Sequence, residues 1–287
     1  MREAVISFPL LGGDFQLNPP YCITIGGFNI YFYGMIIALG LLLAVAYAVR
    51  VHARFHISVD AIYDYVIWGV LSAVLFARLF YCLAYTDASG VHTYLREPRR
   101  FLYIRDGGLA IYGGVLGAAL ALLLRARMRR ESPWPILDIM GMGLPIGQSV
   151  GRWGNFFNRE AYGYETDIFC RMGLTLEGVT VYVHPTFLYE SLWNCLGFVL
   201  LHWLSKTRRR YQGQFLWLYL IWYGFGRMLI EGLRSDSLWL VPGVVRISQL
   251  LAGLSFVCGL VIYVVNARAL AAGKPPLAGR LDDDPTI

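Results

Sequence analysis

The chain has 287 residues, of which 57% are hydrophobic and only 15% are charged, and it carries a formal net charge of +6. This composition excludes an ordinary soluble domain, whose surface would need many more Lys, Glu and Asp side chains. The positive charge does not indicate nucleic acid as a partner, because the basic residues are dispersed among long apolar runs. A membrane is the expected partner.

Seven apolar runs have about the length that a helix needs to cross the hydrocarbon core of a bilayer. They cover residues 30–49, 62–85, 109–124, 136–157, 185–204, 215–230 and 247–265. The sequence therefore predicts an all-α polytopic membrane protein with about seven transmembrane helices. We expect one transmembrane domain over residues 1–270, followed by a disordered cytoplasmic tail over residues 271–287.

The charges of the loops predict the orientation of these helices. Basic residues follow the first, third and fifth runs: Arg50 and Arg54, then Arg125, Arg127, Arg129 and Arg130, then Lys206, Arg208, Arg209 and Arg210. By the positive-inside rule these loops face the cytoplasm, so the N-terminus lies outside and the C-terminus lies inside. One loop opposes this assignment: between the second and third runs it carries Arg96, Arg99, Arg100 and Arg105, partly offset by Asp87, Glu97 and Asp106.

Cysteine and histidine give little indication of a special site. The cysteines at positions 22, 82, 170, 195 and 258 are scattered, so structural thiols are expected. A disulfide between Cys22 and Cys170 is the alternative, and it requires both residues on the non-cytoplasmic side. The histidines at positions 52, 56, 92, 184 and 202 lack ligand spacing with carboxylates, so no metal site is predicted.

Polar residues within the runs are predicted to gather toward one side of the bilayer. Given the orientation, the position of each residue along its helix sets its depth. The outer half is expected to hold Tyr33, Arg78, Tyr112, Arg152, His184, Arg227, Glu231 and Arg246. A charge at bilayer depth is costly unless it faces a partner or a polar cavity, so a cavity opening outward is our hypothesis. For each arginine taken alone, snorkelling to the interface or a structural ion pair is the alternative.

The sixth run carries a polar stripe. Tyr223, Arg227 and Glu231 are spaced i, i+4, i+8, and Arg234 follows three residues later. In such a stripe the carboxylate is expected to orient an arginine. A guanidinium presents a planar fork of donors that matches phosphate oxygens and stays charged when buried, so the stripe favours an anionic lipid headgroup as ligand.

The fourth run ends in the sequence GRWGNFFNREAYG over residues 151–163. Within it Arg152, Asn155 and Asn158 recur at every third position, a row that apolar packing does not explain. The alternative is a polar helix end capped by Asn158 and Gly163. The glycine-rich stretch over residues 107–117 can serve close packing of helices alone.

The sequence of residues 151–163 resembles the signature of the prolipoprotein diacylglyceryl transferases of bacterial inner membranes. Further matches occur in the same order along nearly the whole chain. They are Tyr33-Gly34, Ala77-Arg78 with Tyr81, Asp106-Gly107-Gly108, His184-Pro185, Leu188-Tyr189-Glu190, and Tyr223-Gly224 with Arg227, Glu231, Arg234 and Asp236. The resemblance implies seven spans, an external N-terminus and a site toward the outer leaflet of the cytoplasmic membrane.

The resemblance also implies a reaction and a set of site residues. The diacylglyceryl group of phosphatidylglycerol would move to the lipobox cysteine thiol of a prolipoprotein signal peptide, releasing glycerol phosphate as the first step of lipoprotein maturation. No cofactor is required, and a monomer is expected. The expected catalytic residues are Arg152, Arg227 and Tyr112. The expected substrate-binding residues are Tyr33, Arg78, Arg152, Asn155, Glu160, His184, Tyr223, Glu231, Arg234 and Arg246.

One departure from the family pattern leaves the base that activates the thiol unassigned. Many members have histidine where this chain has Tyr112, in the element Tyr112-Gly113-Gly114. A phenol with a pKa of about 10 is a poor base at neutral pH, so Tyr112 can instead orient the headgroup. His184 is another candidate base, although a histidine before Pro185 at a helix start is equally suited to a structural role.

A transporter or flippase of an anionic lipid or solute is the alternative function, because arginines in an outward cavity would serve binding equally well. Polarity on one side only, and the lack of any repeat between halves of the sequence, favour the enzyme.

Overall fold

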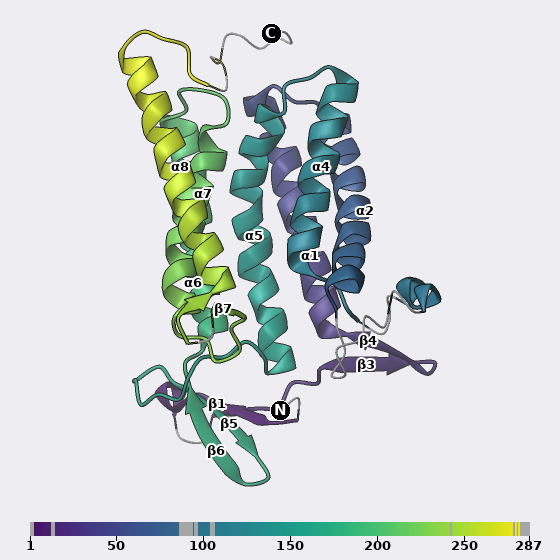
Figure 1. The fold of residues 1–287 in the computed structure, drawn as a ribbon. Helices are drawn as coiled ribbons and strands as arrows, with labels where there is room; N and C mark the ends of the chain where they lie inside the picture. The colour runs from purple at the N-terminus through teal and green to yellow at the C-terminus, as the bar shows by residue number, and fades with distance from the viewer. Residues whose placement is uncertain are drawn as a thin grey trace. The chain divides into compact units, whose positions relative to one another are not determined.

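A computed structural model describes residues 3–12, 15–85, 94, 97–103, 107–241, 243–277, 279 and 281 of the chain. Figure 1 shows the chain as a ribbon coloured along its length. The chain divides into two compact units. The first comprises Met1–Val51 and Leu137–Pro285, and the second comprises His52–Ile136. Of the charges predicted between the second and third runs, Asp87, Arg96, Arg105 and Asp106 lie outside the described residues, as do residues 278, 280 and 282–287 of the predicted tail.

Most of the described residues are helical, and the long helices coincide with the seven apolar runs. They are α1 (Phe32–Val51), α2 (Val59–Ala84), α4 (Ile111–Arg129), α5 (Trp134–Asn158), α6 (Thr186–Thr207), α7 (Gln214–Glu231) and α8 (Ile247–Ala271). Among the described residues, four helical segments are long and apolar enough to cross a membrane: Phe32–Phe55, which extends α1, and α2, α4 and α8. The chain is thus a helical membrane protein, whereas seven spans and the orientation of the termini stay predictions.

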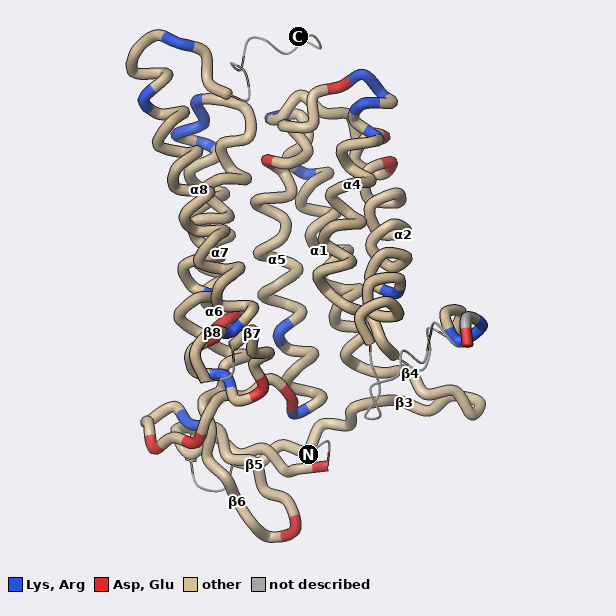
Figure 2. Tube along the Cα trace, viewed as in Figure 1, with Lys and Arg blue, Asp and Glu red and all other residues tan. Residues whose placement is uncertain are grey.

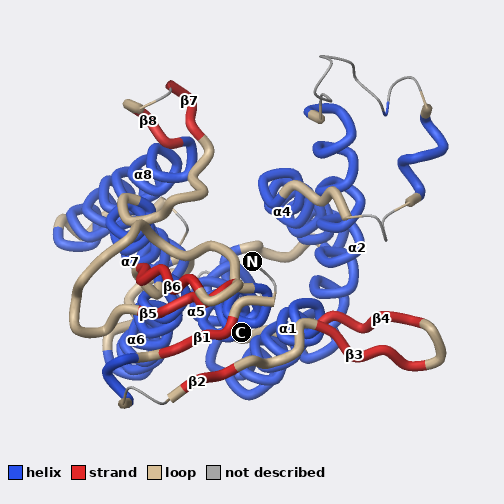
Figure 3. Tube along the Cα trace, turned by 90° about the horizontal axis from the view of Figure 1, so that it is seen from below, coloured by secondary structure: helices blue, strands red, loops and turns tan. Residues whose placement is uncertain are grey.

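The prediction of an all-α chain is wrong in one respect, because the described residues also form short strands. One antiparallel sheet has the order β2-β1-β5-β6, from β1 (Val5–Ser7), β2 (Gln16–Leu17), β5 (Met172–Leu176) and β6 (Val179–Val183). Two further hairpins pair β3 (Cys22–Ile25) with β4 (Phe28–Tyr31) and β7 (Trp239–Val241) with β8 (Val245–Arg246) (Figure 3). Apart from the end of β4, which overlaps the first run, these strands lie before or between the apolar runs, where the length needed to span a membrane gives no signal.

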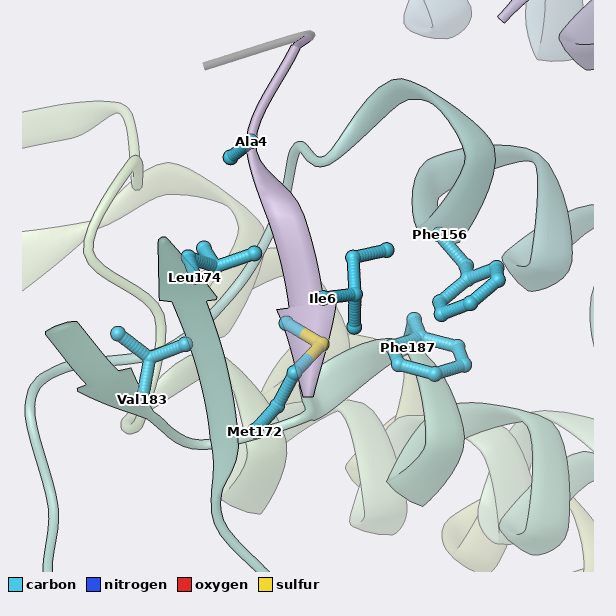
Figure 4. Packing of buried hydrophobic residues seen from close by; sticks show 7 residues of the cluster. All are labelled: Ala4, Ile6, Phe156, Met172, Leu174, Val183 and Phe187. Carbon is cyan, nitrogen blue, oxygen red and sulfur yellow. The ribbon is translucent and has the colours of Figure 1, made fainter. Parts of the chain in front are cut away.

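The four-stranded sheet has its own apolar core. Buried side chains from β1 and the residue before it, and from β5 and β6, meet two phenylalanines of α5 and α6 (Figure 4). They are Ala4, Ile6, Phe156, Met172, Leu174, Val183 and Phe187. Just beyond α5, the buried Arg159 donates to the carbonyl of Ala4 at 3.1 Å and to Oδ1 of Asn18 at 2.8 Å. The sheet therefore fixes the end of α5 and the start of α6.

Helices α6 and α7 of the first unit are joined by two tryptophans. The rings of Trp193 and Trp222 stack with centroids 4.3 Å apart, and each indole N–H donates to the other residue's carbonyl at 3.0 Å. Gly226 faces Trp193 and Gly197 faces Trp222, because a side chain at either glycine would overlap the indole. The glycines thus let the two helices approach closely.

In the second unit, α2 and α4 pack through glycines of the 107–117 stretch. A Cβ at Gly117 would lie 2.6 Å from Cβ of Phe76, and Gly113 faces the same residue. The glycines of α4 therefore serve close packing. At the far end of this pair, Arg125 of α4 binds Asp64 of α2 through both carboxylate oxygens at 2.7 Å.

None of the five cysteines forms a disulfide, and Cys22 and Cys170 are both free. The alternative of a bond between Cys22 and Cys170 is therefore not realised.

Candidate functional site

A buried carboxylate, Glu190, lies near the start of α6 and gathers arginines from two other helices. Its side chain is only 3% exposed. Nη2 of Arg152, from α5, lies 2.6 Å from its Oε2, and Nη1 of Arg227, from α7, contacts its Oε1. Nη1 of Arg234 lies 3.9 Å from the same Oε1. One carboxylate thus holds three guanidinium groups.

A second buried carboxylate, Glu231, completes an arginine–glutamate cluster, which consists of Arg152, Glu190, Arg227, Glu231 and Arg234. Its Oε2 lies 2.5 Å from Nη2 of Arg227, the contact expected from their i, i+4 spacing on α7. Nε of Arg234 is 3.9 Å from the same oxygen, and Arg234 also binds Asp236 through two hydrogen bonds of 3.0 and 2.9 Å. Because Arg227 bridges Glu190 and Glu231, its guanidinium is fixed from both sides.

The register between α5 and α6 explains why Arg152 reaches Glu190. The hydroxyl of Ser149 donates to the carbonyl of Ser191 at 2.9 Å, and the hydroxyl of Ser191 donates to the carbonyl of Ser149 at 2.9 Å. Trp153 adds a hydrogen bond from its indole N–H to Oγ of Ser191 at 3.2 Å. These contacts fix α5 against α6 at positions close to Arg152 on one helix and to Glu190 on the other, so the two side chains meet.

The asparagine row at the end of α5 forms a chain of hydrogen bonds. Nη1 of Arg152 donates to Oδ1 of Asn155 at 3.3 Å. The amides of Asn155 and Asn158 then donate to Oε1 of Glu160 at 3.1 and 3.2 Å. Glu160 is exposed, so the row connects the buried arginine with a carboxylate at the surface.

Two tyrosines flank the cluster. Tyr33 of α1 lies against Gly154, where an added Cβ would be 2.8 Å from Cδ2 of the phenol ring. Tyr33 is near enough to Glu160 and Arg152 to interact with both electrostatically. Tyr223 of α7 stacks on Tyr219 with ring centroids 5.6 Å apart, and it interacts electrostatically with Arg227.

Arg246 and Gly163 hold the segment that follows α7. Arg246 is buried, donates to the carbonyl of Glu231 and to the hydroxyl of Tyr164 at 3.2 Å, and lies over the ring of Trp239. Gly163 pairs with Arg234 in an antiparallel bridge, and a Cβ at Gly163 would lie 2.7 Å from the carbonyl oxygen of Leu233. Both residues support the backbone that carries Glu231 and Arg234.

His184 lies between β6 and α6 and contacts a tyrosine. Its Nδ1 is 3.3 Å from the hydroxyl of Tyr189, which is 3.5 Å from Sγ of Cys170. Its backbone pairs with Tyr164 and Gly163. Burial lowers the pKa of His184, so the imidazole is neutral at pH 7 and able to accept a proton. Its contacts suit a structural role equally well.

Arg78 and Tyr112 belong to the second unit. Arg78 is 1% exposed, and its guanidinium donates five hydrogen bonds of 2.6 to 3.2 Å to main-chain carbonyls. The acceptors are Arg100, Phe101, Tyr103, Gly107 and Gly108. Because these bonds occupy all five guanidinium donors, Arg78 orders this loop, and headgroup binding by it stays a prediction. Tyr112 is half-buried in the first turn of α4.

Glu190 is the residue that the sequence reasoning missed. It stood in the motif Leu188-Tyr189-Glu190 but was not among the expected site residues. The available signal was a single carboxylate near the start of a long apolar run, since such a group needs a cationic partner at bilayer depth.

Chemically, the cluster offers fixed guanidinium groups for an anion. Among the described residues no group of His, Cys, Asp and Glu could hold a metal ion.

The chain is similar to known proteins over most of its length. The family model described as prolipoprotein diacylglyceryl transferase matches residues 20–265. A phosphatidylglycerol–prolipoprotein diacylglyceryl transferase of Bacillus cereus (strain 03BB102) is 40% identical over 273 residues, which cover 92% of this chain and 98% of the relative. Proteins of the same name from Bacillus thuringiensis subsp. konkukian and Bacillus anthracis have the same identity and coverage. The chain therefore belongs to the prolipoprotein diacylglyceryl transferase family.

Proposed function

We propose that this chain transfers the diacylglyceryl group of phosphatidylglycerol to the cysteine thiol of prolipoproteins, the activity for which its Bacillus relatives are named. The observation that carries the proposal is the pair Arg152 and Arg227, held together by the buried carboxylate of Glu190. Two guanidinium groups fixed side by side form a site for a phosphate group.

The chemistry requires a thiolate and stabilisation of the leaving group. The thiolate attacks the C3 carbon of the glyceryl group, a carbon–sulfur bond forms, and the bond from that carbon to the phosphate oxygen breaks. The phosphodiester monoanion becomes a more highly charged phosphomonoester, glycerol phosphate. Arg152 and Arg227 can therefore stabilise the transition state more than the bound substrate.

The remaining site residues are proposed to bind the substrate or to hold the arginines. Tyr33, Asn155, Glu160 and Tyr223 would contact the headgroup from α1, from the end of α5 and from α7. Glu231, Arg234 and Arg246 would fix Arg227 and the backbone that follows α7, supported by their mutual contacts. Arg78, Tyr112 and His184 stay candidates without an assigned step, and so the base for the thiol stays unassigned.

The proposed membrane arrangement follows from the loop charges. We place seven spans in the cytoplasmic membrane of the bacterium, with the N-terminus outside and the arginine cluster toward the outer leaflet. The loop from α6 to α7 supports this, because Lys and Arg gather at that end of the two helices (Figure 2), whereas Glu190 lies near the opposite end of α6. A monomer is proposed as the working unit.

Replacing Arg152 by Ala tests the function. The purified variant in proteoliposomes should lose transfer from labelled phosphatidylglycerol to a lipobox peptide while it stays inserted and folded, because the leaving phosphate loses a fixed donor. Arg268→Ala, at the exposed end of α8, is the control. Normal turnover by Arg152→Ala would refute the assignment. Label on the peptide cysteine supports the transferase, whereas label that crosses the bilayer would support a transporter instead.

Tyr112→Phe tests the role of the phenol in the same assay. We expect transfer to continue with a raised KM for phosphatidylglycerol, because a phenol is a poor base and its hydroxyl can orient the headgroup. Activity identical to the wild type excludes proton transfer by this hydroxyl. A complete loss of kcat with unchanged KM would contradict the expectation and favour Tyr112 as the base.

A further inference from the structure

A second basic site lies at the other end of α6 and α7. A cavity of about 240 Å³ is lined by Leu204, Arg208, Arg210, Gln214, Leu218 and Tyr263. Arg208 directly follows α6, whereas Glu190 lies near its start, so the two positions are about 27 Å apart along the helix axis. That separation is close to the thickness of the hydrocarbon core. In the proposed membrane arrangement, on which this inference rests, the cavity therefore lies in the opposite leaflet from the arginine–glutamate cluster.

The two arginines of this cavity differ from those of the cluster. Arg152 and Arg227 bind buried carboxylates. In the part of the chain that the structure describes, the side chains of Arg208 and Arg210 have neither an ion pair nor a hydrogen bond. Their main-chain groups bond to Gln214 and, at Arg208, also to the carbonyl of Leu204. Their guanidinium donors are thus available to an anion from outside the protein.

The loop that carries these arginines is held rigidly. Gln214, which is 3% exposed, donates to the carbonyl of Arg208 at 3.0 Å and accepts from the N–H of Arg210 at 2.7 Å. Beneath it, the buried carboxylate of Asp138 accepts the N–H groups of Gly213 at 2.9 Å and Phe215 at 2.7 Å. Hydrogen bonds from buried side chains therefore hold the backbone at Arg208, at Arg210 and at the start of α7.

The walls of the cavity become apolar toward the membrane. Leu204 precedes Arg208 by one helical turn on α6, and Leu218 follows Gln214 by one turn on α7. Tyr263 of α8 lines the third side. The cavity thus has basic residues at one end and apolar residues at the other, which matches a phosphate joined to a glycerol backbone and acyl chains. Basic pockets between transmembrane helices are known to bind lipid headgroups.

We propose that this cavity binds the phosphate headgroup of an anionic phospholipid in the leaflet opposite the arginine–glutamate cluster. Arg208 and Arg210 contact the phosphate oxygens, and Leu204, Leu218 and Tyr263 contact the glycerol and the first acyl carbons. The lipid bound here is a structural ligand that fixes the ends of α6, α7 and α8. The proposal concerns binding alone and does not depend on the transfer reaction.

The test is a lipid titration of the intact protein. Wild type in phosphatidylcholine micelles is titrated with phosphatidic acid, and the unfolding midpoint is followed as a function of lipid concentration. Arg208→Gln combined with Arg210→Gln should raise the apparent Kd of a saturable component at least about tenfold, because two charge-assisted contacts are lost. Lys206→Gln combined with Arg268→Gln removes the same charge outside the cavity and should leave this component unchanged.

Three outcomes would overturn the proposal: an unchanged Kd in the cavity variant, an equal loss in the control variant, or an equal saturable shift with inorganic phosphate alone. The last result would assign the site to a free anion instead of a lipid. Because Arg208 and Arg210 are exposed, both variants should fold. If the double variant fails to insert, each single variant should still raise the Kd about threefold, half of the effect on a logarithmic scale. Transfer to a lipobox peptide should remain at the wild-type rate.

Discussion

Glu190→Gln is the sharpest test of the arginine cluster, because it removes one charge and almost no volume. In the wild type the carboxylate of Glu190 contacts Arg152 at 2.6 Å and also binds Arg227. In the variant Arg227 keeps Glu231 at 2.5 Å, whereas Arg152 keeps only the amide oxygen of Asn155 at 3.3 Å. The substitution should therefore release Arg152 more than Arg227.

The magnitude follows from these contacts. Breaking a buried ion pair by removal of one partner costs about 3–5 kcal/mol. The amide of Gln can still accept one hydrogen bond and Arg227 keeps a carboxylate, so a loss near the lower limit, about 3 kcal/mol in the free energy of unfolding, is expected. Displacement of a donor from the leaving phosphate should lower kcat by about 10²–10³.

Unfolding in detergent and transfer to a lipobox peptide measure the two effects separately. KM for phosphatidylglycerol should not rise, because removal of a negative charge strengthens the attraction of the arginines for the lipid anion while their orientation is lost. Glu177→Gln, at the exposed turn between β5 and β6, is the matched control. If Glu190→Gln kept its stability within about 0.5 kcal/mol, the range of ordinary surface substitutions, and also its kcat, this reasoning would be refuted.

Two further predictions concern the segments around the cluster. Gly163→Ala should lower the free energy of unfolding by about 1–3 kcal/mol, because the new Cβ would lie 2.6 Å from Cβ of His184. Gly69→Ala is the control, because a Cβ at that position meets no atom within 4 Å. Equal stability of the two variants would contradict the prediction. Because burial lowers the pKa of His184, below about pH 6.5 the unfolded chain binds a proton that the folded chain does not. The free energy of unfolding should therefore fall as the pH drops below that value and stay level above it. His184→Gln should reduce this fall. If the unfolding midpoint changed equally with pH in both proteins from pH 7.5 to about 5, the prediction would be contradicted.

The helices could be predicted from the sequence because a bilayer imposes a length on them. Each apolar run corresponds to one long helix. For example, the predicted run 30–49 corresponds to the helix Phe32–Val51, and the run 247–265 corresponds to the helix Ile247–Ala271. The strands were missed because they are two to five residues long and, except for the end of β4, lie outside these runs. The sheet depends on pairing of β1 with β5, which are separated by most of the chain, and local pattern carries no information on such a pairing.

The contact of an arginine within one helix was predictable from the sequence, but the contact between helices was not. The i, i+4 spacing on one helix indicated that Arg227 and Glu231 meet. The contact of Arg152 with Glu190 joins two helices, so it follows from the register set by Ser149 and Ser191 and not from spacing in the sequence. Arg78 shows the converse: burial of an arginine can equally be satisfied by main-chain carbonyls.

The charges of the cluster explain how buried arginines can be stable and still receive an anion. Arg152, Arg227 and Arg234 face the two buried carboxylates of Glu190 and Glu231, which leaves one positive charge in excess. The side chain of Asp236 is 49% exposed, so water screens its charge. A phosphodiester carries one negative charge and would balance this excess. In the proposed reaction, a second charge would develop on the phosphate as the carbon–oxygen bond breaks, and it would compete with Glu190 for the same guanidinium donors. The carboxylates that keep the arginines buried therefore also set the charge that the cluster accepts.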